Sequence, residues 1–212
     1  MKKILLICLL SVNLFAQTVY TPKNTELKDG IVISIDTKKP INGIVKLYYM
    51  TGEFKVTVPF KDGKVNGMLI YYNIKGKIVK FVVYKEGKQN GIQKNYLASG
   101  ELEAEITFKD GKKNGMQKIY YKSGELSSET PYKDGYKNGI SNLFFKTGEL
   151  KAERPYKNGI MDGTRRFYYI NANLKSEITF KEGKAVKGFI YAKDGQKTQL
   201  TNAHFHKMKL NY

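Results

Sequence analysis

The stretch NGMQKIYYKSGELSSETPYKDGYK, residues 114–137, is one copy of a 24-residue unit that is repeated along most of the chain. An Asn-Gly pair opens the copies at residues 42, 66, 90, 114 and 138, and Asp162-Gly163 opens a sixth copy. Two more glycine columns keep the same spacing: Gly63, Gly87, Gly111, Gly135, Gly159 and Gly183, and Gly52, Gly76, Gly100, Gly124 and Gly148. A fixed period of this length indicates a repeat architecture in which each unit is one small structural element.

Each unit contains two short apolar-patterned runs and two turns. In the copy at 114–137 the runs are 116–121 and 126–133, which have the length and the β-branched and aromatic content of strands. The loop Lys-Ser-Gly at 122–124 fits a three-residue hairpin loop, whose last residue needs a positive φ. The Asp-Gly and Asn-Gly pairs within 133–139 indicate a longer turn to the next unit. Each unit is therefore predicted to be a β-hairpin.

The three-residue loop also predicts which residues face each other across the hairpin. It places Tyr120 opposite Leu126 and Met116 opposite Thr130, so that these side chains share one face. Four columns then form the predicted core: Ile44, Met68, Ile92, Met116 and Ile140; Tyr48, Tyr72, Tyr96, Tyr120, Phe144 and Tyr168; Phe54, Ile78, Leu102, Leu126, Leu150 and Leu174; and Phe60, Tyr84, Phe108, Tyr132, Tyr156 and Phe180. A one-residue slip would expose all four columns, so we expect a well-defined register.

The first sixteen residues have the pattern of a secretory signal peptide. Met1-Lys2-Lys3 is a basic start, and the apolar run 4–10 fades toward Ala16, after which we expect cleavage. The run is too short for a transmembrane helix, and an uncleaved anchor is the alternative. Cleavage would remove Cys8, the only cysteine of the sequence. The pattern predicts an exported chain without disulfides, located in the periplasm, outside the cell or at its surface.

The rest of the chain divides into three parts. Residues 17–41 are interpreted as a lead-in and an N-terminal cap strand, residues 42–195 as the repeat array, and residues 196–212 as a C-terminal cap or tail. Atypical end units of this kind close the exposed edges of repeat arrays. We therefore expect one all-β domain, built as an elongated antiparallel sheet of stacked β-hairpins.

The sequence is strongly basic, with 37 basic and 19 acidic residues and a formal net charge of +18. Such a balance can favour anionic lipid, anionic glycan or nucleic acid. The lysines recur with the repeat and do not form one dense block, which also fits a solvated surface. Predicted export makes nucleic acid the least favoured of these partners.

One lysine column has no exception in the six units, and it follows the predicted core aromatic by one residue: Lys61, Lys85, Lys109, Lys133, Lys157 and Lys181. Neighbouring units are two strands apart, so these lysines should lie about 9–10 Å from one another. They could form a ladder for an anionic polymer or lipid surface through many weak contacts. Alternatively, they solubilise the strand ends and protect edges against aggregation.

Aromatic residues are expected on the same face as the lysine column. The candidates for partner binding are Tyr121, Phe145 and Tyr169. Such rings could stack on the rings of a partner, or they could form a second half-buried layer within the protein. The sequence leaves both interpretations open.

The sequence does not indicate an enzyme. A kinase needs a phosphate-binding loop, a catalytic aspartate and acids that hold metal ions, whereas the glycines here are turn glycines at a fixed period. Four glutamates that recur every 24 residues are expected on an exposed face: Glu105, Glu129, Glu153 and Glu177. His204 and His206 lack a third ligand nearby in the sequence, which favours a solvated tail over a metal site. No catalytic residue, metal or cofactor is therefore predicted.

The pattern Asn-Gly…Tyr-Tyr-x-x-Gly-Glu-Leu…Tyr-Lys-Asp-Gly resembles the MORN repeat in its bacterial variant. The resemblance covers about residues 42–195, and Lys77 and Ala172 depart from the turn glutamate and the turn glycine. It implies an elongated, twisted antiparallel sheet of stacked hairpins. Many bacterial members of the family are labelled as antitoxin or immunity components, and others carry a phosphatidylinositol-phosphate kinase label that the kinase argument above does not support here.

These observations together lead to one functional expectation with two alternatives. We expect an exported, non-enzymatic repeat protein that acts as a scaffold for a protein partner. The first alternative is an antitoxin or immunity protein that binds and neutralises a toxin. The more distant alternative is a binder of anionic lipid or glycan that uses the lysine ladder.

Overall fold

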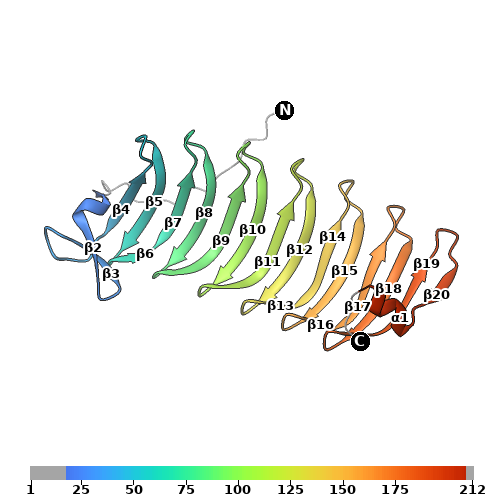
Figure 1. Ribbon diagram of the computed structural model, residues 1–212. Coiled ribbons are helices and arrows are strands. Elements are labelled where there is room, and N and C mark those ends of the chain that lie inside the picture. Colours follow the sequence, from blue (N-terminus) through green and yellow to red (C-terminus); the bar gives the residue numbers. More distant parts are fainter. Residues whose placement is uncertain (1–17, 209–212) are drawn as a thin grey trace.

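The computed structural model describes residues 18–208, and the predicted signal peptide with Cys8 lies outside the described residues. The structure is 62% strand and 5% helix, and 18 of the described strands belong to a single sheet. Figure 1 shows the hairpins side by side in one elongated, curved array that runs from β4 to β20. The expectation of an all-β, elongated antiparallel sheet of stacked hairpins is confirmed.

The described elements follow the repeat closely. Those before the first unit are β1 (Val19–Tyr20), the 3-10 helix η1 (Pro22–Asn24), β2 (Thr25–Lys28) and β3 (Ile31–Ser34). The first three units contain β4 (Gly43–Tyr48), β5 (Phe54–Lys61), β6 (Lys64–Val65), β7 (Gly67–Tyr72), β8 (Ile78–Lys85), β9 (Lys88–Tyr96) and β10 (Leu102–Lys109). The next three contain β11 (Lys112–Tyr120), β12 (Leu126–Lys133), β13 (Tyr136–Lys137), β14 (Gly139–Phe144), β15 (Leu150–Lys157), β16 (Ile160–Met161), β17 (Gly163–Tyr168) and β18 (Leu174–Lys181). The last elements are β19 (Lys184–Tyr191), β20 (Lys197–Gln199) and the helix α1 (Asn202–Lys207).

The tip of each hairpin is the predicted three-residue loop. In the unit at 114–137, the Tyr121 N–H donates to the Glu125 carbonyl at 2.8 Å, and the Gly124 N–H donates to the Tyr121 carbonyl at 2.9 Å. Gly124 has a φ of 99°, which a residue with a side chain rarely adopts. Tyr120 pairs with Leu126, as predicted.

A β-bulge just behind this tip makes the rest of the predicted register wrong. The pairing shifts between Tyr120 and Ile119, so that Ile119 lies opposite Ser128, and Met116 lies opposite Pro131 instead of Thr130. The same shift occurs in the other hairpins of the array. Because side chains alternate between the faces of a strand, the extra residue turns the remainder of the second strand over.

The predicted core columns consequently lie on two different faces. We call the face of the Tyr132 column the inner face and the face of the Tyr120 column the outer face. The buried side chains of the array belong to the inner face: Val45, Val56, Leu69, Val82, Gln93, Ala104, Thr130, Ser141, Ala152 and Ile178. On the outer face the predicted core residues Met68 and Ile140 are 48% and 52% exposed. The prediction that all four columns form one core is therefore wrong.

A tight turn joins one unit to the next, where the sequence predicted a longer turn. Lys133 pairs with Tyr136, so the loop consists of Asp134 and Gly135 alone. Both have a positive φ, 51° and 94°, which is the type I′ arrangement of two-residue hairpins. The chain therefore returns directly along β12, and the sheet continues without a gap between units.

Each of these turns is also bonded to the preceding unit. The Gly111 N–H donates to the Gln89 carbonyl at 2.8 Å, and the Gly135 N–H donates to the Lys113 carbonyl at 2.9 Å. The same bond recurs at Gly63, Gly87, Gly159 and Gly183. Next to it, the Asn114 amide donates to the Asp134 carboxylate at 3.3 Å. These bonds explain why the Asn-Gly and Asp-Gly pairs keep a constant distance in the sequence.

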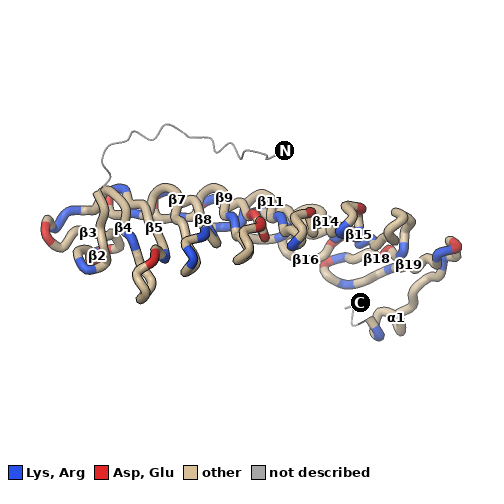
Figure 2. Tube along the Cα trace, turned by 90° about the horizontal axis from the view of Figure 1, so that it is seen from above, with Lys and Arg blue, Asp and Glu red and all other residues tan. Residues whose placement is uncertain are grey.

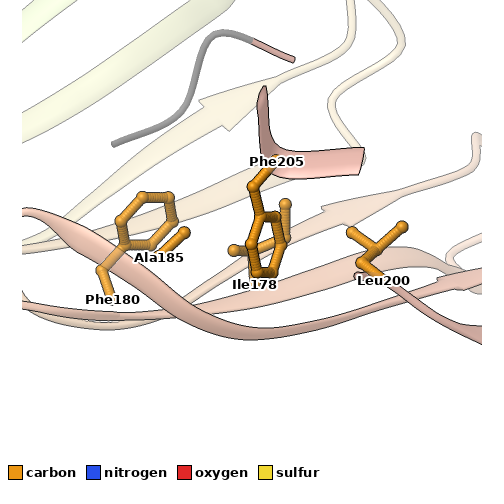
Figure 3. Packing of buried hydrophobic residues seen from close by; sticks show 5 residues of the cluster. All are labelled: Ile178, Phe180, Ala185, Leu200 and Phe205. Atoms are coloured by element: carbon orange, nitrogen blue, oxygen red, sulfur yellow. The ribbon is translucent and has the colours of Figure 1, made fainter. Parts of the chain in front are cut away.

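Non-repeat elements close both ends of the sheet. At the N-terminal end, β1 pairs in parallel with β4, and the Val32 N–H of β3 donates to the Gly63 carbonyl of the first turn at 2.8 Å. Residues 18–41 thus contain more regular structure than the expected lead-in and single cap strand. At the C-terminal end, α1 lies against the inner face, and Figure 3 shows Phe205 directed onto Ile178. Phe180, Ala185 and Leu200 complete this cluster.

The C-terminal cluster leads to a prediction about stability. Phe205 is 2% exposed, so Phe205→Ala should lower the free energy of unfolding by about 3–4 kcal/mol, because it removes a buried ring and leaves a cavity. Urea unfolding with hydrogen exchange of β18 and β19 measures the effect. His206→Ala, at an exposed position of the same helix, should change stability by less than about 0.5 kcal/mol. Equal effects of the two substitutions would contradict the role of α1 as a cap.

A second prediction concerns two glycines on either side of one boundary between units. Gly115 has a φ of 110°, and a Cβ there would lie 3.1 Å from the Thr107 Cβ, whereas Gly111 has a φ of 82° and open space around it. Gly115→Ala should therefore cost about 2–3 kcal/mol and Gly111→Ala about 1–2 kcal/mol. Urea unfolding curves of the two variants check the order. A larger loss for Gly111→Ala would contradict the close approach of the strands.

Candidate interaction surfaces

The lysines of the predicted column end the second strands of the hairpins. Lys109 is the last residue of β10 and Lys133 the last residue of β12, and the six lysines of the column are exposed. In four units the lysine pairs with another lysine across the two-residue turn, as Lys109 does with Lys112. Figure 2 shows that basic residues are spread along the length of the molecule. The column is thus a basic edge at the inter-unit turns.

The aromatic candidates lie at the other end of the hairpins. Tyr121 directly follows β11 at the tip loop, whereas Lys133 is at the far end of the neighbouring β12. The seven residue-to-residue steps from the start to the end of β12 span about 24 Å. The structure therefore does not bring the aromatic candidates and the lysine column together into one surface.

The same aromatic residues make contacts within the protein. The Tyr121 hydroxyl donates to the Phe144 carbonyl of the next hairpin at 2.7 Å, and Tyr169 makes the equivalent bond at 3.0 Å. Phe145, which has no hydroxyl, lies 5.5 Å from the Lys151 Nζ, measured to the ring centroid. Of the two interpretations left open by the sequence, these contacts favour the half-buried layer that connects hairpins.

The outer face carries a ladder of carboxylates with basic and tyrosine partners. Glu105 accepts hydrogen bonds from Lys94 Nζ at 2.6 Å and from the Tyr120 hydroxyl at 3.0 Å. The Tyr168 hydroxyl donates to Glu153 at 2.6 Å in the same way two units later. The recurring glutamates thus lie on the outer face, where the Glu105 side chain is half-buried among its partners and is 26% exposed.

These contacts change the pKa values of both partners. Burial by itself raises the pKa of Glu105, but the hydrogen bonds from Lys94 and Tyr120 outweigh it and hold this pKa below its usual range. Burial and the bond to Glu105 raise the pKa of Tyr120 to about 12. The pair is therefore most stable with an ionised carboxylate and a neutral phenol.

Next to the ion pairs, the outer face leaves large apolar side chains open to solvent. Met68, Ile92 and Ile140 follow the Asn-Gly pairs of their units and are 45–52% exposed. Nearer the tips, Tyr48, Phe54 and Ile78 are also exposed. Phe54 and neighbouring residues line an open depression of about 470 Å³ between the first two tips. Exposed apolar side chains that recur along one face offer an interaction site, so this row is the candidate protein-binding surface.

The described residues provide little for metal binding. No group of three or more histidine, cysteine, aspartate or glutamate residues that could hold a metal ion occurs within 18–208. His204 and His206 lie on α1 and are exposed, and the His204 Nδ1 is 2.8 Å from the Thr201 hydroxyl at the start of the helix. In the same range, none of the helices has the length and apolar content needed to cross a membrane.

Comparison with known families supports the repeat assignment. Three consecutive units match the MORN repeat variant, at residues 89–110, 113–134 and 137–158. The resemblance deduced from the glycine and aromatic columns is thus confirmed for these units. MORN repeats are non-enzymatic and are commonly protein- or membrane-binding modules. A search of curated proteins found no match.

Two solved structures are distantly similar to this chain. A mutant of S. aureus TarM in complex with fondaparinux, alpha-GlcNAc-glycerol and UDP is 10% identical over 57% of this chain, with a TM-score of 0.27. A GtfA/B complex bound to UDP and GlcNAc is 13% identical over 57% of this chain, with a TM-score of 0.24. The matches span 21% and 26% of those chains. Neither similarity bears on the function of this protein.

The carboxylate ladder leads to a prediction about pH. Tyr120→Phe should lower the free energy of unfolding by about 1 kcal/mol near neutral pH, a small value because the pair is partly open to water. Since the pKa of Glu105 is lowered, this difference should shrink as the pH falls below about 4. Since the pKa of Tyr120 is raised to about 12, it should persist up to the ordinary tyrosine pKa and disappear as the pH rises through about 12. Urea unfolding over this pH range measures it.

Tyr121→Phe is the matched control for this prediction. Its hydroxyl donates to the neutral Phe144 carbonyl, so its loss should cost a similar amount that does not change in acid. For the test variant Tyr120→Phe, Phe144 occupies the equivalent position in the following unit, so phenylalanine fits at position 120. The same acid dependence in both variants would show that Glu105 is not the cause.

Proposed function

We propose that this protein is a non-enzymatic scaffold that binds a protein partner through the outer face of its repeat array, outside the cytoplasm. The observation that supports this proposal is the row of half-exposed apolar side chains that recurs with the repeat, such as Met68, Ile92 and Ile140. The matched MORN repeat variants support a binding role in general terms. Apolar and aromatic side chains form the centre of most protein interfaces.

The charges of the outer face favour a protein over an anionic membrane. Glu105, Glu129, Glu153 and Glu177 lie beside the apolar row, and ion pairs such as that of Glu105 with Lys94 neutralise basic groups that would otherwise attract anionic headgroups. A protein partner can instead place apolar groups on the row and polar groups at the carboxylates. The apolar row and the carboxylate ladder together would then give affinity and orientation.

The sheet is also suited to binding because its backbone is already ordered. Bonds between units, such as that from Gly135 to Lys113, hold neighbouring hairpins in a constant relation. A preformed surface loses little conformational entropy on binding, which leaves more of the contact energy as affinity. A long, regular surface is therefore available to a partner without rearrangement.

The export part of this proposal rests on the sequence, namely on the basic start and apolar run of residues 1–16. The alternatives of an antitoxin and of a lysine-ladder binder for anionic lipid or glycan stay predictions.

Site-specific crosslinking in intact cells tests the outer face. A photoreactive amino acid at Ile92 or Ile140 should give the same covalent adduct with one partner, because both positions belong to the exposed row. Replacing Met68 and Phe54 by serine in the crosslinking chain should reduce the adduct about tenfold or more, since each loses apolar contact area. Mass spectrometry of the adduct identifies the partner.

Two controls make this experiment decisive. The photoreactive group at Lys109, on the basic edge, should give no such adduct. The adduct should be recovered from the envelope or the medium. An adduct at Lys109 but not at Ile92 would contradict the outer face as the binding surface, and recovery from the cytosol alone would contradict export.

A further inference from the structure

The central row of the inner face changes character along the array. Each unit contributes two residues to this row, which lie opposite each other on paired strands. In order along the array, the pairs are Val45 with Val58, Leu69 with Val82, Gln93 with Ile106, Gln117 with Thr130, Ser141 with Arg154, and Arg165 with Ile178. The first units are apolar, and Ile178 at the end is covered by α1. Between them lies a largely polar section in which the buried hydroxyls of Thr130 and Ser141 are hydrogen-bonded at 2.7 Å.

Four basic side chains gather on this polar section, each beside an aromatic ring. Lys113 Nζ lies 4.8 Å from the ring centroid of Tyr132, and Lys137 Nζ lies 4.9 Å from that of Tyr156. The guanidinium groups of Arg154 and Arg165 both lie over one further ring, Phe167, at 5.7 and 5.1 Å. Cations held over rings keep their positive charge while their stems are buried.

These basic groups have no acidic partner on their own face. None of the four forms an ion pair within residues 18–208, and Glu153 on β15 and the glutamates of the adjacent strands, Glu129 and Glu177, lie on the outer face. Arg165 Nε is buried without a hydrogen-bond partner. Burial, and then the neighbouring Arg154, lower the pKa of Arg165, and burial, and then Lys137, lower the pKa of Lys113. Partly buried like charges of this kind are normally compensated by an anion.

We infer that these cations and rings, which we call the inner strip, bind an extended acidic segment of a protein. The inner strip consists of Lys113, Tyr132, Lys137, Arg154, Tyr156 and Arg165. This inference goes beyond the outer-face interaction proposed above, because it concerns the opposite side of the sheet and a different chemistry. The acidic segment either belongs to the same partner or to a second one.

The geometry favours a polypeptide with carboxylate side chains. From β11 to β17 the inner strip crosses about four strand spacings, or roughly 19 Å, which matches about six residues of an extended chain. Guanidinium groups recognise carboxylates through paired hydrogen bonds, and the tyrosine rings provide flanking apolar surface. α1 shows that a segment of polypeptide fits on this face just beyond the strip, with Phe205 inserted against it (Figure 3).

α1 itself does not supply the missing negative charge. Its residues include His204, His206 and Lys207 and no aspartate or glutamate. The helix therefore covers the apolar end of the inner face and leaves the inner strip to an acidic occupant. Charge complementarity, with four cations and no acid, is the feature that selects the class of partner.

Fluorescence anisotropy with a labelled oligoglutamate peptide of about eight residues tests the inference at about 50 mM salt, where surface charges are weakly screened. The chain offers fitting replacements, because Gln89, Gln93 and Thr130 occupy the equivalent positions in other units. The test variant is Lys113→Gln, Lys137→Gln, Arg154→Thr and Arg165→Gln. It should bind the peptide at least about tenfold more weakly than the unchanged chain.

The lysine column supplies a matched control. Replacing Lys85, Lys109, Lys133 and Lys157 by glutamine removes the same amount of charge from the basic edge, and it should weaken peptide binding by less than about threefold. Equal weakening by both variants would show that net charge alone attracts the peptide and would overturn the inference. Replacing outer-face Ile92 and Ile140 by serine should leave peptide binding unchanged, so failure of this inference and failure of the proposed function are distinguishable.

Further probes and variants distinguish the remaining outcomes. Phosphatidylserine-containing vesicles and a single-stranded oligonucleotide are probes for anionic lipid and nucleic acid. The inner-strip variant should bind these two probes no more weakly than the lysine-column variant does. Weaker binding of either probe by the inner-strip variant, or a lack of saturable peptide binding by the unchanged chain, would overturn the inference. Circular dichroism reports whether the fourfold variant folds. If it does not, Lys137→Gln alone should still weaken peptide binding by about threefold, compared with Lys133→Gln.

Discussion

The hydrogen bond from each inter-unit turn glycine to a carbonyl of the preceding unit is the constraint on which this structure depends. It requires the turn to have two residues of positive φ, such as Asp134 and Gly135. An isolated hairpin of this size is only marginally stable in water, so the units need one another. Because this bond and the sheet pairing repeat together, adding a unit extends the array without changing its geometry.

The β-bulge behind each tip gives the single sheet two faces of different chemistry. It turns the second strand over, so that small buried residues such as Ala152 and Ser141 lie on one side, while Tyr120 and its column lie on the other. The inner face therefore contains the core together with the row of buried polar groups. The outer face keeps its carboxylate ladder and its large apolar side chains accessible to a partner.

Charge is distributed in the same ordered way. Acidic side chains such as Glu105 lie among the outer-face ion pairs, the lysine column lies at the edge formed by the turns, and Arg154 and Arg165 lie on the inner face without acids. A net positive charge that looks uniform in the sequence is therefore divided among three surfaces. Each surface therefore has its own local charge, because the attraction between charges depends on what lies within a few ångströms.

The sequence by itself determined the repeat, the hairpins and the pairing of Tyr120 with Leu126, because turn glycines and alternation act over a few residues. It did not determine which face is buried. The bulge falls at Ser127, and the equivalent positions in other units, such as Val79 and Glu103, share no common residue type, so no local signal marks it. Likewise, only strand pairing between units brings Lys113, Lys137 and the two arginines onto one face, because their proximity depends on the registers of several hairpins at once.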